Sequence, residues 1–460
     1  MKTMKTLFLI LGIIFTIYSC TKEETITPVD FPKNLKVENF KFPEDSLQIM
    51  SWVENQDTQK IVAHAWGIWA GLTEPTNQKF NGQTLLVFET WMGVQELAAL
   101  SANRQVADKN IIRKNRTHLN PPKQFGHGFL LTGEKHIVDS NFSVLETVSY
   151  DPTAAKFVTE NLLFNQSKLN TFKVKEKVGK VPEFPNTSIT IKPTYYAGVP
   201  DKNGYIRVPV WTEPRVPGAY KYTEWNEWVF VDIKNKQEEG KVIYPTKNPT
   251  PSSGDMYWST CNLNEFIHYK IDRVGADYLN NHQDVGTLPS RQFIQGDYVL
   301  LVAMHVTTKE FKNWTWQTFF WTPDVENPPF PSSYFEASLM PVELKGAASH
   351  YAVSVAYAMV WPNQPITGGT DKDAIPIISF NPYLEGGFGP KVFSLPNKFR
   401  PDFVYGMQTN CMSCHALSTM TGKNGYTTNQ YIDMMDTTLF KNDVKLDFTW
   451  SIQGNINSDK

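Results

Sequence analysis

The sequence predicts a mainly β protein with some α-helix, in which a β-sandwich-like body is followed by a short helical segment at the C-terminus. Three observations predict this fold class. Six strand-like runs lie between residues 188 and 321, and the first three of them alternate apolar and polar side chains with period two. Aromatic residues make up 13% of the chain and proline contributes 30 residues, which favours strands and loops over helical bundles. The length of 460 residues suits two or three domains around a large core.

The N-terminus has the pattern of a signal peptide. Lys2 and Lys5 precede an apolar run from Leu7 to Ile17, which is shorter than the roughly 20 residues of a membrane span. Tyr18, Ser19 and Cys20 follow this run, and the stretch 17–20 resembles a bacterial lipobox. That resemblance implies cleavage before Cys20 and acylation of its thiol. An ordinary secretory signal with a chance cysteine at its end is the alternative.

We therefore expect a lipoprotein signal peptide over residues 1–19 and a lipid-anchored tether over residues 20–42. Thr21-Lys22-Glu23-Glu24 resembles the acidic export tag of Bacteroidetes-type surface lipoproteins. A solvated tether without a tag is the other reading of residues 21–34, which contain two prolines. The resemblance implies an outer membrane lipoprotein of the cell envelope, facing the periplasm or the cell surface.

Residues 43–180 are expected to form a mixed α/β region. Apolar residues at helical spacing predict one or two amphipathic helices over 43–72, with a start at 44–46. A buried strand is predicted over 84–90, a short helix over 92–100 and a helix from Asp151 to about Leu169. His64 lies among apolar residues and is interpreted as a core histidine rather than an iron ligand.

Residues 181–400 are expected to form the β-rich body. The alternating runs predict strands at 188–195, 205–210 and 227–233, and the runs that follow them predict strands at 265–271, 298–306 and 314–321. Trp316, Phe319 and Trp321 cluster on the last of these runs. We interpret them as core aromatics, with a sugar-binding platform or a haem edge as the alternative.

The last region, residues 401–460, contains Cys411-Met412-Ser413-Cys414-His415. Two thiols at positions i and i+3 lie on one side of a helical turn, so both can add to the two vinyl groups of one porphyrin. The following imidazole can then reach the iron. This run resembles the haem-binding motif of cytochrome c domains, although the match covers little beyond these five residues. The resemblance implies one covalent haem c on Cys411 and Cys414, with His415 as the proximal iron ligand.

Three other readings of the motif remain: a redox-active cysteine pair, a structural disulfide and half of a zinc site. A zinc site needs about four ligands, and the remaining cysteines, Cys20 and Cys261, have no nearby histidine in the sequence. Cys261 is interpreted as a small buried hydrophobic residue. Attachment of haem outside the cytoplasm agrees with the expected secretion signal.

The distal iron ligand is left open between Met434, Met435 and an upstream histidine, with His118 and His127 as loop candidates. Only 45 residues (460 − 415) follow His415, which is short for a class I cytochrome c domain. We therefore expect the haem to lie against the β body, with pocket walls from residues before 400.

These expectations favour a c-type mono-haem lipoprotein that transfers electrons outside the cytoplasm. A haem-dependent oxidoreductase or peroxidase is one alternative, and a non-redox lipoprotein that binds a glycan or a partner is another. The partners implied are a redox partner protein or a small-molecule substrate, and a membrane through the lipid anchor. A net charge of −2 gives no electrostatic reason to expect nucleic acid. No residue outside the motif is nominated as catalytic.

Overall fold

The structure is a computed structural model of the chain, and it describes residues 24–119, 144–213, 225, 227–237, 257–281, 291–361, 375–385, 409–424 and 431–457. It contains 28% helix and 24% strand, so the expected mixture of sheet and helix is confirmed. The expected signal peptide over 1–19, Cys20 and His127 lie outside the described residues. No helix in the described ranges is long and apolar enough to cross a membrane.

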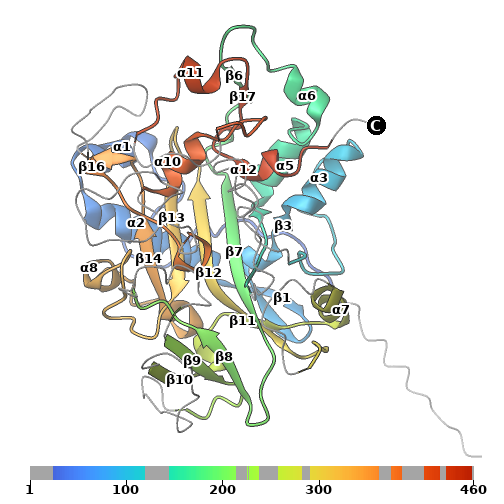
Figure 1. The fold of residues 1–460 in the computed structure, drawn as a ribbon, viewed down its shortest axis with the longest axis vertical. Helices are drawn as coiled ribbons and strands as arrows, with labels where there is room; N and C mark the ends of the chain where they lie inside the picture. The colour runs from blue at the N-terminus through green and yellow to red at the C-terminus, as the bar shows by residue number, and fades with distance from the viewer. Residues whose placement is uncertain are drawn as a thin grey trace, which may run out of the picture.

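A central antiparallel sheet of eight strands organises the chain (Figure 1). Its main path runs β14-β13-β12-β7-β5-β3, with β11 paired to β12 and β4 paired to β7. The long strands β7 and β12 pair over ten residue positions, from Tyr298–Gly198 to Thr308–Ile189. Their bounds, in path order, are Tyr351–Val355 (β14), Thr315–Trp321 (β13), Tyr298–Thr308 (β12), Ile189–Gly198 (β7), Ser149–Tyr150 (β5) and Met92–Gly93 (β3), with His268–Lys270 (β11) and Val144–Glu146 (β4) beside them.

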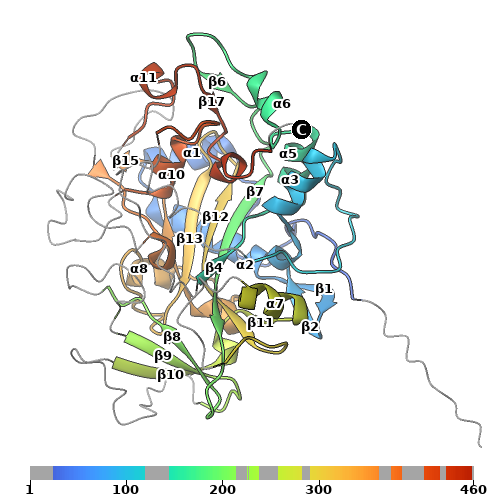
Figure 2. The ribbon, with the colours of Figure 1, turned by 45° about the vertical axis from the view of Figure 1, so that its right-hand side comes forward.

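Smaller sheets lie around the central one. The three-stranded sheet β10-β9-β8 lies at the lower end of the molecule in Figures 1 and 2. Within it, strand β10 runs parallel to β9. Three further sheets have two strands each and pair β1 with β2, β15 with β16, and β17 with β6. Their bounds are Pro75–Phe80 (β1), Gln83–Leu86 (β2), Gly179–Lys180 (β6), Tyr205–Pro209 (β8), Glu227–Asp232 (β9), Tyr257–Asn262 (β10), Val360–Trp361 (β15), Ile375–Pro376 (β16) and Val444–Lys445 (β17).

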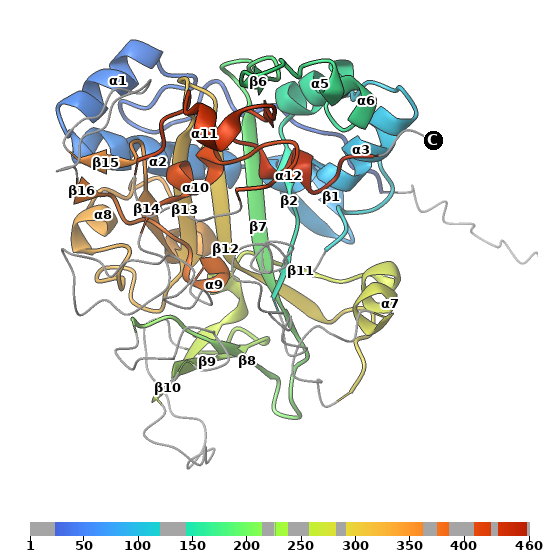
Figure 3. The same ribbon diagram turned by 45° about the horizontal axis from the view of Figure 1, so that its top comes forward.

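Helices cover both faces of the central sheet. In Figures 1 and 3, α2 lies behind the sheet, whereas α10 and α12 lie in front of β13, β12 and β7. The helices are Ser46–Glu54 (α1), Thr58–Leu72 (α2), Val94–Ala102 (α3), Pro152–Glu160 (α5), Gln166–Asn170 (α6), Arg273–Asn281 (α7), Tyr334–Ser338 (α8), Pro382–Glu385 (α9), Cys411–Ala416 (α10), Thr437–Phe440 (α11) and Trp450–Gln453 (α12). The second layer against this sheet is therefore helical among the described residues.

The α2 side of the sheet is an aromatic core. Phe319 on β13 is fully buried, and its ring stacks on Trp69 of α2 with centroids 4.4 Å apart. Trp321 stacks on Phe266 with centroids 4.1 Å apart. Phe319 and Trp321 therefore belong to this core, as interpreted, whereas Trp316 is buried on the opposite face of β13, against His415 of α10. Because strands from residues 43–180 and from 181–400 pair in one sheet, both regions share one hydrophobic core.

Side-chain caps define where several helices begin. Asp45 precedes α1 and accepts hydrogen bonds from the backbone amides of Leu47 and Gln48. The Asp151 carboxylate accepts hydrogen bonds from the backbone amides of Thr153 and Ala154 at the start of α5, whose first residue is proline.

Two predicted segments end earlier than expected. The run 84–90 is a strand only to Leu86 and then a 3-10 turn, because the Glu89 carboxylate accepts from the Leu86 amide. The helix from Asp151 ends at Glu160, and α6 follows after a break.

Residues 24–42, which belong to the expected tether, pack on the body in the structure. Ile26 exchanges two backbone hydrogen bonds with Arg113, of 2.8 and 2.9 Å, and is fully buried. The rings of Phe31 and Phe40 lie over Gly71 and Gly67 of α2. A Cβ atom on Gly67 would be 2.0 Å from the Phe40 ring, so glycine is required at this contact.

Candidate functional site

The expected haem motif forms α10, which begins after Asn410. The Asn410 carboxamide oxygen accepts a hydrogen bond of 2.9 Å from the Ser413 amide, and its nitrogen donates to the carbonyls of Met359 and Ile377 at 3.0 and 2.9 Å. A helix of six residues is too short to be stable alone. Asn410 therefore both caps α10 and ties it to the chain beside the central sheet.

Cys411 and Cys414 are buried and are not joined by a disulfide. The Cys411 sulfur lies 4.0 Å from the carbonyl oxygen of Ser379. Burial raises the pKa of both thiols, and the nearby Glu385 carboxylate raises it further. Both cysteines are therefore thiols at neutral pH in this arrangement. Cys261 is also a buried thiol, which agrees with its interpretation as a small apolar residue.

His415 follows the cysteines and is held in one tautomer. Its Nδ1 donates a hydrogen bond of 2.7 Å to the carbonyl oxygen of Phe448. Since a carbonyl only accepts, the proton is assigned to Nδ1 and the lone pair to Nε2. Burial lowers the pKa of His415 to about 3, so the ring is neutral at pH 7. The Trp316 ring packs beside it, with centroids 4.4 Å apart.

The Phe448 carbonyl is presented by an unusual turn. Asp447 and Phe448 both have left-handed backbone conformations, with φ of 47° and 69°. Such conformations cost on the order of 1–3 kcal/mol each outside glycine and persist only where the surroundings enforce them. Two contacts from this part of the chain fix α10: the Phe448 carbonyl on His415, and the Trp450 indole, which donates to the Cys414 carbonyl at 3.2 Å.

A buried ion pair holds this turn to the body. The Lys309 ammonium lies 2.7 Å from the Asp447 carboxylate, and the two side chains are 4% and 9% exposed. The second carboxylate oxygen accepts from the Phe184 amide at 3.1 Å. The position of the His415 acceptor therefore depends on a residue that lies 138 positions earlier in the chain.

A second histidine lies on the sheet face that α10 covers. His305 on β12 is paired with Thr318 on β13, and Trp316 lies two residues from Thr318 on the same strand. Side chains of paired residues, and of residues two apart, lie on one face of a sheet. His305 and Trp316 therefore share a face, and Trp316 packs against His415.

His305 has one engaged ring nitrogen and one without a partner. Its Nε2 lies 2.7 Å from a carboxylate oxygen of Glu385 on α9. Its Nδ1 is buried and makes no hydrogen bond within the described residues. Lys192 on β7 is paired with His305 and forms an ion pair of 2.7 Å with Glu146 on β4. This face of the sheet therefore carries His305, Lys192 and Glu146, and the helix α9 adds the Glu385 carboxylate to it.

The two methionine candidates for the distal ligand both lie beside lysine side chains. Met435 is 53% exposed, and its sulfur is 3.4 Å from the Lys180 ammonium. The Met434 sulfur is 3.3 Å from the Lys445 ammonium, which also donates to the carbonyl of Ala416 at the end of α10. Both sulfurs are therefore in contact with lysine side chains.

The other candidate histidines have separate environments. His64 is buried, with Nδ1 2.7 Å from the Tyr357 hydroxyl and Nε2 3.1 Å from Glu310, as expected of a core histidine. His118 is exposed and lies beside Tyr278 in a cleft described below. Within the described ranges, no three His, Cys, Asp or Glu side chains are grouped to hold a metal ion.

The residues of α10 fit a covalently attached haem in their chemistry. Two unlinked thiols lie one helical turn apart, and the next residue is the neutral imidazole of His415. Because its Nδ1 donates to the Phe448 carbonyl, the lone pair of Nε2 is available to bind a metal. A ligating histidine commonly donates its other ring nitrogen to a carbonyl or carboxylate in this way. The buried, unpartnered Nδ1 of His305 is a further nitrogen on the adjoining sheet face.

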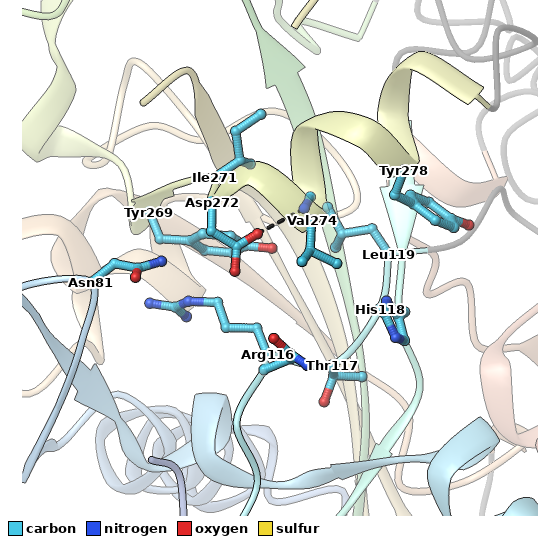
Figure 4. A pocket seen from close by; sticks show the side chains of 12 residues that line it. Asn81, Arg116, Thr117, His118, Leu119, Tyr269, Ile271, Asp272, Val274 and Tyr278 are labelled. Carbon is cyan, nitrogen blue, oxygen red and sulfur yellow. Dashed lines mark hydrogen bonds between the residues drawn. The ribbon is translucent and has the colours of Figure 1, made fainter. Parts of the chain in front are cut away.

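A cleft lined by other residues lies beside α7 (Figure 4). The Arg116 guanidinium is 4.0 Å from the centroid of the Tyr269 ring and forms an ion pair of 2.7 Å with Glu89. In Figure 4, Asn81 lies at the same end as Arg116, and Asp272 extends over the cleft. The cleft thus places an aromatic ring next to amide, guanidinium and carboxylate groups.

Comparisons of the chain with protein-family models, with curated proteins and with solved structures found no match.

Two groups of the site have weak sequence signals. Phe448 contributes a backbone carbonyl, which has no signature in any sequence. His305 is a lone histidine in the apolar run 298–306, and this departure from the strand pattern is the signal that could have singled it out.

Proposed function

We propose that this chain is a c-type mono-haem protein that transfers single electrons outside the cytoplasm. Cys411 and Cys414 would hold the haem through thioether bonds, and His415 would bind the iron through Nε2. The observation that carries the proposal is the hydrogen bond from His415 Nδ1 to the Phe448 carbonyl, next to two unlinked cysteines one helical turn away. A structural disulfide gives this histidine no role, and a redox-active pair would use a protonated imidazole to stabilise its thiolate, whereas burial keeps His415 neutral at pH 7.

The chain's own residues account for the binding and orientation of such a group. The iron of a bound haem supplies a one-electron redox couple. Asn410 fixes the start of the helix that carries both thiols. Phe448 sets the tautomer and the orientation of His415 and increases the basicity of its Nε2. Trp316 restricts water at the His415 ring because the indole is 4% exposed.

Burial of the cysteines bears on the order of events. The thiolate is the reactive form of cysteine, and burial in the folded arrangement disfavours it. We therefore expect the thioether bonds to form before residues 431–457 pack over α10.

The test is expression of the chain with cytochrome c maturation machinery, followed by a haem-stained denaturing gel and a reduced-minus-oxidised spectrum. We expect a covalent haem band and a c-type reduced spectrum. A variant with Cys411→Ser and Cys414→Ser should lose the band, whereas Cys261→Ser should retain it. A colourless wild-type protein would refute the proposal and leave the cysteines as free thiols or as a disulfide.

We also propose that the protein is a lipoprotein of the outer membrane, acylated at Cys20. The lipobox-like stretch 17–20 and the preceding apolar run support this. Mass spectrometry of the mature N-terminus checks it: the expected form begins at Cys20 and carries acyl chains. Cleavage at another position, without acylation, would refute it.

Binding of a small glycan is the second candidate function, and the cleft in Figure 4 favours it. An aromatic ring beside amide, guanidinium and carboxylate groups is a suitable surface for a sugar. Calorimetric titration with a panel of oligosaccharides, repeated with Asp272→Ala, tests this candidate. Absence of binding across the panel would remove it.

A further inference from the structure

We propose that His305 supplies the second axial nitrogen of the iron, a role that rests on the proposed attachment of haem to Cys411 and Cys414. The role would make the iron six-coordinate with two histidine ligands. His305 belongs to the β body and lies 110 positions before His415 in the sequence (415 − 305), so the haem would join the C-terminal segment to the central sheet.

The first support is position. His305 projects from β12 on the face that α10 covers, as its pairing with Thr318 and the packing of Trp316 on His415 establish. The Cys411 sulfur lies 4.0 Å from the carbonyl oxygen of Ser379, three residues before α9 begins, and α9 carries Glu385, the partner of His305. The second histidine and the haem-attachment residues therefore meet in one place.

The second support is the unpartnered nitrogen. A buried polar atom without a hydrogen bond costs about 1–3 kcal/mol, so folded proteins rarely leave one without a reason. His305 Nδ1 is such an atom. A bond to a metal would satisfy its lone pair.

The third support is the carboxylate of Glu385. With Nε2 donating to Glu385 at 2.7 Å, the lone pair of His305 is left on Nδ1. A carboxylate that accepts from one ring nitrogen while the other binds a metal fixes the ring and raises its basicity. His415 and His305 are thus held in the same manner, one by a carbonyl and the other by a carboxylate.

The fourth support comes from the competing ligands. Met434 and Met435 contact lysine side chains, and Met435 is half exposed. Both ring nitrogens of His64 are engaged in the core. Among these described candidates, His305 alone combines the correct face with an unpartnered ligand atom.

The experiment uses the haem-loaded full chain and compares the wild type with His305→Ala. We expect a low-spin, six-coordinate spectrum for the oxidised wild type and a high-spin spectrum for the variant. Added imidazole should restore the low-spin spectrum of His305→Ala by occupying the vacated position. His350→Ala is the matched control, because His350 is also mostly buried beside a carboxylate, Glu265, at 3.8 Å. Its spectrum should remain that of the wild type.

Glu385→Gln is a milder second variant that retains the His305 ring. It should stay low-spin with a raised reduction potential, because a less basic imidazole stabilises the oxidised iron less. A low-spin spectrum that persists in His305→Ala, or a high-spin wild type, would overturn the role of His305 while leaving the covalent haem intact. Absence of covalent haem from the wild type would instead overturn the proposed function itself.

Discussion

The ion pair between Lys309 and Asp447 offers a direct test of how the C-terminal segment is held to the body. Lys309→Met retains the length and apolar stem of the side chain and removes its charge. Asp447 then remains buried with one hydrogen bond, from the Phe184 amide, in place of the ion pair. Removing one partner of a buried pair costs about 3–5 kcal/mol.

Relaxation of the turn at Asp447 and Phe448 offsets part of this loss of stability. Asp447 and Phe448 hold left-handed conformations that cost on the order of 1–3 kcal/mol each, and the turn can relax once the pair is broken. We therefore expect the free energy of unfolding to fall by about 3 kcal/mol. Lys309 also donates to the Lys312 carbonyl at 3.0 Å, so its loss leaves that carbonyl unpaired.

Urea unfolding followed by tryptophan fluorescence measures this change. The exposed neighbour Lys312 provides the control, since Lys312→Met should alter stability by no more than about 0.5 kcal/mol. The double variant Lys309→Met, Asp447→Asn should cost less than the two single variants added together, because it leaves no unpaired buried charge. A loss below about 1 kcal/mol for Lys309→Met would show that the turn is held by its other contacts.

Three further outcomes are expected. Gly67→Ala should destabilise the protein by about 1–3 kcal/mol in urea unfolding, because its Cβ would be 2.0 Å from the Phe40 ring; Phe40→Ala should remove most of that effect, and an unchanged midpoint for Gly67→Ala would contradict the packing of Phe40 on α2. Phe319→Ala should cost about 3–5 kcal/mol in the same assay, since the ring is fully buried against Trp69, and a cost below 1 kcal/mol would argue against this core. Burial raises the pKa of Asp151 from its usual 3.8 to about 6, so the folded state binds the extra proton and the wild type should lose about 3 kcal/mol as pH rises from about 4 to about 6. Asp151→Asn should lack that dependence when unfolding is measured at pH 4 and pH 7, and equal slopes for the two proteins would refute the assignment.

Local patterns in the sequence were sufficient for many elements but not for their long-range contacts. The helical spacing in 43–72 predicted α1 and α2, and alternation predicted β7, β8 and β9. Glycine disfavours a helix interior, yet the structure uses Gly67 and Gly71 to admit Phe40 and Phe31 from the segment expected to be a tether. The partners of Gly67 and Gly71 lie 27 and 40 positions away in the sequence, where no local periodicity can reveal them.

The candidate site shows the same limit. The spacing of Cys411, Cys414 and His415 predicted a helical turn with both thiols on one side, and α10 is that turn. The acceptor of His415 is a backbone carbonyl, so its identity depends on the chain path and not on a residue type. The role proposed for His305 depends on strand register, which places it under α10 only after the sheet has formed.

The packed segment that begins at Ile26 limits how far the body can move from a membrane. If Cys20 carries the lipid, only six residues (26 − 20) separate the anchor from the first backbone bonds to the body. A linker of six residues reaches at most about 20 Å when fully extended. A folded protein of 460 residues has a radius of gyration of about 22 Å, so the linker is no longer than the radius of the body. The protein would therefore lie against the bilayer and meet membrane-bound redox partners by diffusion within the membrane plane, while soluble partners would reach only the faces turned away from it.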